Sequence, residues 1–560
     1  MPKEQELIAR IKELESELAR TKKQKRYGLV WEDKKEDVVE RCKHELPVLL
    51  ADESKTLSDN PNWPTNILIE WDNFHALSVL AYTHDKKVDV IYIDPPYNTG
   101  NKSWRYNNDY VELDDAYRHS KWVSMLERRI QLAKQLLSDW WIIVCAIDDY
   151  ETHNVRMMFD DIFWETNRLW TACVVHNPGW RQDEQFFPTA HEYMYVYTNN
   201  IERCELWRLE ISEEKRGQYS NKDEHWKYKL RWFRRSGANS KRTDRPNLFY
   251  PIYLDEETLA LSIENTKWTI ELLPIDDDGV ERCWRWNAKS FTEKKDQYIE
   301  TKIIKGKYSL QVKEREDDNV WEKPKTLWNN PKYSAVNWTN LLKKIFNKEK
   351  IFDYPKSLYL LLDIVKIVSK ENSIILDFFA WSGTTGHAVL ELNKEDGGNR
   401  QFILCTNNEN KIAEEVTYPR IRNVIKWYAD VEGIPANLRY YRTNFISNDK
   451  SIDDLRHKFI LRCSEMLQIR ESCFDVSALN GDEYFQVFEN KDLVLAILYH
   501  PYEIKRLREI ISQTEKPIVA YIFSMGMEIF QEELAEYGDK VRIETVPDEI
   551  LETYKKIFGF

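Results

Sequence analysis

Apolar and polar positions alternate along residues 65–165 in the rhythm of an α/β protein. Short apolar runs predict buried parallel strands at 67–71, 88–93 and 141–147. The segments between these runs carry apolar residues at helical spacing, which predicts helices at 74–82 and 120–137. Strands that alternate with helices in this way predict βαβ units and a mostly parallel sheet.

The rhythm is lost over residues 166–350, which are aromatic, polar and irregular, and it then returns. The returning pattern predicts helices at 357–369 and 386–393 and strands at 373–379 and 401–406. An α/β core interrupted by an unlike insert is the simplest architecture that fits this order. Further apolar strands at 493–499 and 517–523 predict a small C-terminal α/β domain whose role the sequence does not indicate.

These changes of pattern predict five segments of chain. They are an N-terminal helical region at 1–60, a first part of the core at 61–165, an insert at 166–350, a second part of the core at 351–447 and a C-terminal α/β domain at 448–560. Within the first segment, a narrow apolar seam predicts a helix at 5–20, formed by Leu7, Ile11, Leu14 and Leu18. This helix could pair with another helix or lie on the protein's own surface.

Composition narrows the class of protein. The chain has 560 residues, enough for several domains, and a net charge of -13. We find no apolar run of the roughly 20 residues that a membrane span needs and no apolar stretch of a signal peptide, so we expect a cytoplasmic protein without membrane contact. The eight cysteines are scattered, with no CxxC pair, so we expect reduced thiols and no metal site.

Positive charge is concentrated in the insert despite the acidic total. Between Lys215 and Arg245 there are eleven lysines and arginines against three acids, interleaved with aromatic residues such as Trp226 and Trp232. Most charge runs are solvated surfaces, but this mixture also neutralises phosphates and stacks on bases. The candidate DNA-binding residues are Lys227, Lys229, Arg231, Arg234, Arg235, Lys241, Arg242 and Arg245.

The first candidate for chemistry is Asp94-Pro95-Pro96-Tyr97, which directly follows the predicted strand at 88–93. The Asp94 side chain and carbonyls on a stiff proline loop can accept both hydrogens of an exocyclic amine, which localises the nitrogen lone pair. The Tyr97 ring offers a stacking surface for a base rotated out of a duplex. Most Pro-Pro pairs are only turns, but the carboxyl end of a parallel strand is where open α/β sheets bind ligands.

The second candidate is the loop of small residues at 380–386, between the predicted strand at 373–379 and the helix that follows. This geometry wraps backbone around a nucleoside cofactor. A single glycine loop is weak evidence, whereas the combination with Asp94-Pro95-Pro96-Tyr97 is specific.

Together these motifs resemble the β-class amino-methyltransferases of DNA, and in particular the modification subunits of type III restriction systems. The resemblance covers most of residues 27–447. It is carried by IYIDPPYNTGN (91–101), Asp148-Asp149, LDFFAWSGTTGHAVLELN (376–393), FILCTNNEN (402–410), YPRIRNVIKWY (418–428) and NLRYYRTNF (437–445).

The resemblance implies a Rossmann-like methyltransferase fold in permuted order, with the insert as a target-recognition domain. It implies S-adenosylmethionine as cofactor, with Asp94, Pro95 and Pro96 holding an adenine amino group and Tyr97 stacking on the base. The residues implied for the cofactor pocket are Asp72, Asp377, Phe379, Ala380, Ser382, Gly383, Thr384 and Glu409. For Glu409, a solvated loop acid is an equally good interpretation. Implied partners are double-stranded DNA, a restriction helicase-nuclease subunit and a second copy of the chain.

The function that follows is methylation of adenine N6 at specific DNA sites in a restriction-modification system. Two alternatives stay open: methylation of cytosine N4, and a DNA-recognition subunit that has lost catalysis and only directs a partner nuclease-helicase. Asp94 favours adenine, since serine is commoner at this position in cytosine-N4 enzymes of the family.

One departure from the family pattern concerns tryptophan. The family carries glycine where this chain has Trp381, and a bulky side chain there should block the close backbone approach that glycine permits. We expect glycine also at the positions of Trp71, Trp141, Trp164, Trp232, Trp338 and Trp427. The chain has 21 tryptophans and only 16 glycines, although glycine alone usually makes up about 7% of residues. Our hypothesis is that UGA codons read as glycine were translated as tryptophan; a degenerate methyltransferase is the competing explanation.

Overall fold

The computed structural model describes residues 34–559 apart from 59, 61–62, 100–116, 178–185, 212, 266–268, 318–320, 348–351, 353–354, 449–451, 461 and 524–533. The helix predicted at 5–20 lies outside the described residues. The chain divides into two compact units. The first contains the chain up to Trp207 and from Lys325 onward, and the second is Arg208–Pro324.

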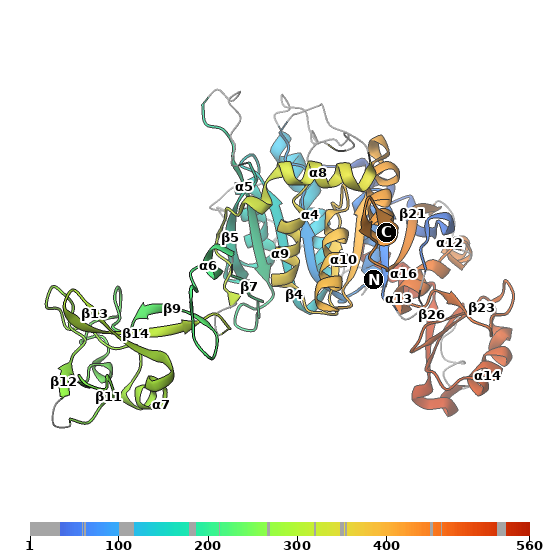
Figure 1. Ribbon diagram of the computed structural model, residues 1–560. Coiled ribbons are helices and arrows are strands. Elements are labelled where there is room, and N and C mark those ends of the chain that lie inside the picture. The colour runs from blue at the N-terminus through green and yellow to red at the C-terminus, as the bar shows by residue number, and fades with distance from the viewer. Residues whose placement is uncertain are drawn as a thin grey trace, which may run out of the picture. The chain divides into compact units, whose positions relative to one another are not determined.

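A large, mostly parallel sheet forms the centre of the first unit (Figure 1). The strands β21, β2, β18, β17, β3 and β4 run parallel to their neighbours, and β1 and β6 pair antiparallel with β21 and β4. In order across the sheet, the strands are β1 (Glu45–Ala51), β21 (Asn437–Ser447), β2 (Thr65–Glu70), β18 (Gln401–Thr406), β17 (Ile374–Asp377), β3 (Val88–Ile93), β4 (Leu137–Ile147), β6 (His191–Thr198), β5 (Arg168–Val175) and β16 (Leu327–Trp328).

Strands from the two parts of the core alternate in this sheet. β2 lies between β21 and β18, and β17 pairs with β3 in parallel, with Leu376 opposite Ile91. The chain therefore leaves β3 and β17 at the same edge of the sheet, where ligands bind in open α/β folds. The sheet is Rossmann-like and its strand order is permuted, as predicted.

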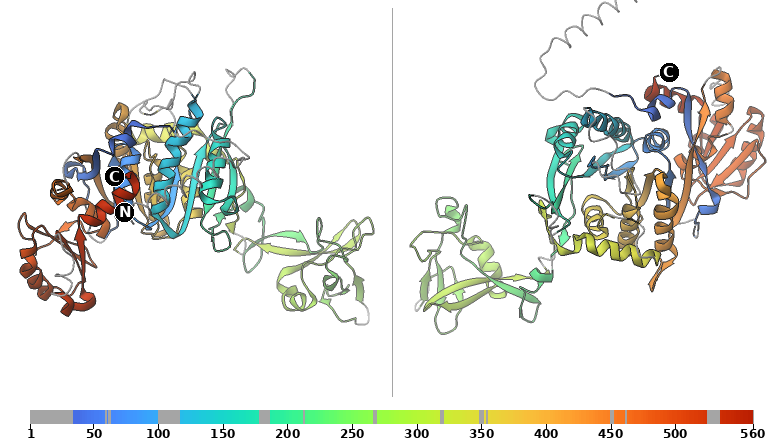
Figure 2. Two further views of the ribbon diagram at one scale, coloured as in Figure 1. Left: turned by 180° about the vertical axis from the view of Figure 1, so that it is seen from behind. Right: turned by 90° about the horizontal axis from the view of Figure 1, so that it is seen from above.

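Helices cover both faces of the sheet (Figures 1 and 2). On one face α9 (Leu358–Val368) packs against α10 (Thr384–Asp396), and on the other α3 (Asn73–Thr83) packs against α4 (Arg118–Leu136). Fully buried apolar side chains from both parts of the core, such as Leu80 and Phe378, meet in one hydrophobic cluster. The predicted helices and strands of the core are thus confirmed, with ends that differ by a few residues.

The second unit is shorter than the insert predicted at 166–350. Residues 168–198 form β5 and β6, and 327–346 form β16 and α8 (Ala335–Phe346); all four belong to the first unit. β5 and β6 pair antiparallel, and β6 carries three tyrosines, so these two strands lack the continuous β-branched runs of the parallel strands. β16 pairs parallel with β5 but has only two residues.

The second unit has two small antiparallel sheets of three or more strands, besides a short antiparallel pair of β7 (Leu209–Glu210) and β15 (Trp321–Glu322). One has the order β13 (Ile299–Ile304), β14 (Lys307–Arg315), β9 (Lys227–Trp232) and β8 (Asn221–Lys222). The other has the order β11 (Leu261–Ser262), β10 (Ile252–Asp255) and β12 (Thr269–Leu272). Phe233, Trp284 and Phe291, the last from α7 (Ala288–Tyr298), form the centre of its own hydrophobic core.

The C-terminal segment has its own sheet and packs on the core of the first unit. The sheet contains β22 (Asp475–Val476), β23 (Phe485–Glu489), β24 (Val494–Leu498), β25 (Ile518–Phe523) and β26 (Val541–Val546), so the strands predicted at 493–499 and 517–523 are confirmed. Its last helix, α16 (Asp548–Phe558), contacts α3, and the Tyr554 hydroxyl donates to the Pro47 carbonyl at 2.6 Å. Across the part of the chain that the structure describes, no helix is long and apolar enough to cross a membrane.

Candidate active site and cofactor loop

Asp94 stands directly after β3 with its side chain almost fully buried, 14% exposed. Its Oδ1 lies 3.2 Å from the Nζ of Lys356, which precedes α9. Burial raises the pKa of the Asp94 carboxyl to about 6, and the Lys356 ammonium acts against this rise. Asp94 is therefore a desolvated acceptor whose ionisation depends on one neighbouring cation.

Lys356 also joins Tyr97 to Glu192, a buried carboxylate on β6. The ammonium donates to the Tyr97 hydroxyl and to Glu192 Oε2, and the Tyr97 hydroxyl donates to the same oxygen at 3.1 Å. Sequence reasoning missed Lys356 and Glu192. Their only signals were a lysine beside the helix predicted at 357–369 and an acid among the aromatic residues of β6.

Hydrogen bonds from neighbouring side chains fix the loop of Pro95 and Pro96. The buried Trp122 side chain donates its Nε1 hydrogen to the Pro96 carbonyl at 2.7 Å. Asn98 follows with a φ of 59°, a left-handed conformation that asparagine tolerates, and it donates to Glu151 at 2.7 Å. Pro95 and Pro96 are buried as well, so the whole motif is rigidly held.

Asp377, the last residue of β17, anchors the loop of small residues. Its carboxylate accepts from the Phe379 backbone N–H at 3.0 Å and from the Thr385 hydroxyl. Burial raises the pKa of Asp377 to about 7. Phe379 and Ala380 are buried, and the Ala380 N–H donates to the Cys405 carbonyl at the end of β18.

A buried arginine holds the next part of this loop. Arg420, from α11 (Tyr418–Lys426), donates to the hydroxyls of Ser382 at 3.1 Å and Thr384 at 2.8 Å. Between them Gly383 adopts a φ of 74°, which glycine reaches without strain. Arg420 was not among the predicted site residues, although the segment YPRIRNVIKWY contains it.

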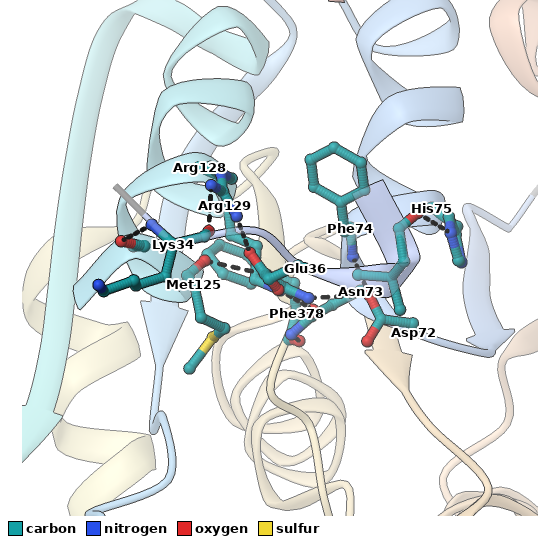
Figure 3. Close-up of polar contacts among 12 residues, drawn as sticks. Lys34, Glu36, Asp72, Asn73, Phe74, His75, Met125, Arg128, Arg129 and Phe378 are labelled. Atoms are coloured by element: carbon teal, nitrogen blue, oxygen red, sulfur yellow. Dashed lines mark hydrogen bonds and ion pairs between the residues drawn. The ribbon is translucent and has the colours of Figure 1, made fainter. Parts of the chain in front are cut away.

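Asp72 caps α3, and its neighbour Asn73 ties that helix to the segment after β17, as Figure 3 shows. The Asp72 carboxylate accepts from the Phe74 N–H at 2.8 Å and from Arg129 at 3.0 Å (Figure 3). Next to it, Asn73 donates to the Phe378 carbonyl at 2.9 Å. The structure therefore brings Asp72 to the predicted cofactor loop, while Glu409, three residues past β18, is exposed.

Trp381 crosses the space between the two motifs. Its Nε1 donates to the Asp94 carbonyl at 2.7 Å, and its ring centroid lies 6.0 Å from that of Phe379. Its backbone has a φ of 45°, in the left-handed region that bulky side chains rarely adopt. The indole thus fills the gap between the loop after β17 and the loop after β3.

The predicted DNA-binding residues all lie in the second unit. Lys227, Lys229 and Arg231 belong to β9, and the last two are 3.8 and 3.6 Å from Glu314 carboxylate oxygens. Arg242 forms an ion pair with Glu281 at 3.1 Å, and Arg234 donates to the Ile275 carbonyl. The remaining side chains are exposed, with the exception of half-buried Arg235; they are Lys227, Lys241 and Arg245. Among the described residues, we find no cluster of three or more ligands that could hold a metal ion.

Comparison with known proteins gives one consistent answer. Residues 88–417 match the model of a family described as DNA methylase. The type II methyltransferase M.KpnI of Klebsiella pneumoniae is 34% identical over 369 residues, which are 66% of this chain and 86% of that protein. The Mod subunit of the type III restriction-modification enzyme EcoPI, from Escherichia phage P1, is 30% identical over 483 residues, 78% of this chain and 73% of that one.

Proposed function

The chain belongs to the DNA methylase family and is a site-specific DNA methyltransferase, and we propose that the atom it methylates is N6 of adenine. The observation that carries the proposal is the buried Asp94 at the end of β3, next to the loop that leaves β17. An amino group presented there meets a carboxylate acceptor in a desolvated site.

On the acceptor side, the Asp94 carboxylate accepts one hydrogen of the amino group and the Pro95 carbonyl accepts the other. We assign the carbonyl to Pro95 because that of Pro96 already accepts from Trp122. Holding both hydrogens directs the nitrogen lone pair out of the purine plane. With a pKa of about 6, Asp94 is ionised at neutral pH and also suited to take up the proton that the nitrogen loses. The Tyr97 ring, fixed by Lys356 and Glu192, stacks on the base.

The family's cofactor is S-adenosylmethionine, which supplies an electrophilic methyl group when bound. The buried carboxylate of Asp377, the hydroxyls of Ser382 and Thr384, and the left-handed Gly383 fit a polar nucleoside cofactor wrapped by backbone. Asp72 and Glu409 are the further candidates for contacts with it. Trp381 does not fit, because its indole occupies the gap across which donor and acceptor have to meet.

The test of the proposed function is the identity of the methylated base. Duplex DNA is incubated with the protein and isotopically labelled S-adenosylmethionine, digested to nucleosides and separated by mass. We expect the label in N6-methyladenine. Label in N4-methylcytosine would establish the alternative acceptor and contradict the assignment to adenine.

A second candidate function rests on Trp381 itself. A subunit with a blocked cofactor loop would still recognise DNA and direct a partner. In that case neither this chain nor a form with glycine at residue 381 would bind cofactor or transfer methyl groups.

We propose that the second unit reads the target sequence, with support from its basic and aromatic strand β9 and from its place in the chain between the two parts of the core. Replacing Lys227, Lys241 and Arg245 with alanine is expected to weaken DNA binding about 10- to 100-fold at moderate salt. The slope of log K against log salt should also become shallower by about 2 to 3, since each lost phosphate contact removes about one. Fluorescence anisotropy with a labelled duplex measures both quantities.

The matched control replaces three other exposed lysines of the same unit with alanine, namely Lys289, Lys302 and Lys307. The same loss of net charge should there leave affinity within about threefold, because these side chains lie outside the predicted contact set. Equal losses in both triple variants would contradict the assigned surface.

The partners follow from the relatives. EcoPI Mod is a subunit of a type III restriction-modification enzyme, and we propose that this chain likewise works with a restriction subunit that combines helicase and nuclease. A homodimer as the DNA-bound form and a cytoplasmic location are part of the same proposal. Co-purification of the tagged chain from its host, followed by mass determination of the complex, tests the partner and the copy number together.

A further inference from the structure

Three tryptophans have a positive backbone φ, a conformation that favours glycine. Trp164 has φ 72° and ψ 135°, a combination outside the left-handed helical region and open in practice only to a residue without Cβ. Trp381 has a φ of 45° and Trp71 a φ of 157°. Positive φ at a bulky aromatic residue is a genuine outlier, and here the same residue type repeats it in three separate loops.

The place of Trp164 in the fold agrees with its dihedral angles. It directly follows the last residue of α5 (Thr152–Phe163), and 69% of its surface is exposed. Glycine is strongly enriched at this position, because it ends a helix in a conformation of positive φ. Elsewhere in the chain the residue after α10 is Gly397, with φ 74°, and the residue after α16 is Gly559, with φ 72°.

Trp122 and Trp284 contrast with these three tryptophans. Trp122 is fully buried in α4 and donates to the Pro96 carbonyl, and Trp284 donates to the Tyr250 carbonyl at 2.8 Å and stacks on Phe233. Both indoles are buried and use their N–H in a hydrogen bond, as expected of native tryptophans. Of the other positions at which the sequence suggested glycine, Trp141, Trp232 and Trp338 lie within regular strands or a helix, and Trp427 has an extended φ of 174°. The backbone gives no reason for glycine at those four.

From these observations we infer that the natural protein carries glycine at residues 71, 164 and 381, because UGA codons that its host decodes as glycine have been written as tryptophan. Among the described residues, tryptophan is the only aromatic type with a positive φ, and it has one at three positions. Random decay would place other aromatic types at such positions as well. Glycine at residue 381 would also leave room for the cofactor, because no indole would then fill the gap beside Asp94.

The nucleotide sequence of the gene tests directly whether these three residues are glycine. We expect UGA at residues 71, 164 and 381 and UGG at Trp122 and Trp284, and peptide mass spectrometry of the protein from its host should find glycine at the first three. UGG at residue 164 or 381 would overturn the inference. A measurement on purified protein is independent of the gene: Trp164→Gly is expected to raise the melting temperature of the chain, while Trp122→Gly lowers it. A lower melting temperature for Trp164→Gly would count against glycine at that position.

A separate observation concerns Lys356. It is the cation that faces Asp94, and one ammonium serves two buried carboxylates, Asp94 at 3.2 Å and Glu192. Lys356 belongs to the second part of the core and follows Asp94 by more than 250 residues in the sequence. The other titratable groups that interact with Asp94 are Tyr92, Tyr97, Cys145, Glu192 and Asp377. Near pH 7 Glu192 is anionic, Asp377 with its pKa of about 7 is partly protonated, and the other three are neutral.

We propose that Lys356 is the positioning residue of the acceptor site: it keeps Asp94 ionised and aimed, and it holds the Tyr97 ring through the hydroxyl. This proposal rests on the proposed role of Asp94. Burial and Glu192 both raise the pKa of Asp94, and the Lys356 ammonium opposes them. Without the ammonium, the pKa of Asp94 rises above its value of about 6, so that a larger fraction of the enzyme is protonated and inactive at neutral pH.

The test is the pH profile of methyl transfer in the chain with glycine at residues 71, 164 and 381. For this parent we expect the rate to rise with pH around a midpoint near 6. Lys356→Met should move the midpoint upward by about one pH unit or more and lower kcat at pH 7 by roughly 100-fold, and Lys356→Arg should recover part of the loss. The control is Lys332→Met, which removes an ion pair with Asp363 in the same unit and should change neither quantity.

A Lys356→Met variant that keeps the parental midpoint and rate would overturn the positioning role. Binding of S-adenosylhomocysteine and the melting temperature show whether the variant has merely failed to fold. A parent without any acid limb, or with a limb that survives in Asp94→Asn, would instead contradict the proposed function of Asp94, so the two failures are distinguishable.

Discussion

Glycine in place of Trp381 is expected to raise the affinity for S-adenosylhomocysteine about 100-fold and to turn a nearly inactive chain into an active methyltransferase. To admit a ligand, the present chain has to displace an indole that is packed on Phe379 and bonded to the Asp94 carbonyl. Such a rearrangement costs about 3 kcal/mol, which at about 1.4 kcal/mol per tenfold corresponds to roughly 100-fold in affinity.

Titration calorimetry and transfer of a tritiated methyl group to DNA measure the two effects. Trp232→Gly is the control: it also replaces one tryptophan, but on an exposed strand of the second unit, and should gain neither binding nor activity. The prediction is wrong if Trp381→Gly binds no better than the original chain, and in that event the DNA-recognition subunit becomes the favoured function.

The second large effect is expected at Asp94. In the chain with glycine at residue 381, Asp94→Ala should lower the rate of methyl transfer about 1,000-fold, because a buried acceptor that acts on the reacting amino group is lost. Binding of S-adenosylhomocysteine should change less than about threefold, since the cofactor contacts we assign come from other residues. Single-turnover kinetics at saturating cofactor separates these two quantities.

Asp89→Asn is a matched control on the same strand. Asp89 accepts from Ser138 and from the Ile374 N–H at the start of β17, and its replacement should lower stability while leaving the rate per folded molecule intact. Activity of Asp94→Ala within tenfold of the parent would mean that another group holds the amino nitrogen.

The core could be predicted from sequence because its parallel strands are buried on both faces. Runs such as the one at 88–93 are apolar apart from a single residue, Asp89, and the ends of β3 and β17 then locate Asp94 and Asp377 without knowledge of the fold in detail. The strands β5 and β6 were not predicted. They pair antiparallel beside the parallel region, and their aromatic composition resembled that of the insert.

The residues that hold the motifs in place were harder to predict from the sequence than the motifs themselves. Lys356 and Arg420 are 262 and 38 residues from the side chains Asp94 and Ser382 that they contact, and a lone cation in a helix or loop reads as surface charge. Asp72 was predicted near the cofactor, but its partner Arg129 lies on α4, whose sequence pattern shows only amphipathicity. Such pairings depend on long-range packing, which local periodicity does not encode.

The alternation of early and late strands in the central sheet also governs how the protein is made. During translation β2 emerges without either of its neighbours, since β18 and β21 are encoded more than 300 residues later. Between Glu70 and Gln401 the ribosome adds about 330 residues, which takes roughly 15–65 s at about 5–20 residues per second. Throughout that interval the nascent chain carries unpaired apolar strand edges. We therefore expect that chaperones and a low growth temperature raise the yield of soluble enzyme. Methylation of host DNA then begins only when synthesis of nearly the whole polypeptide is complete.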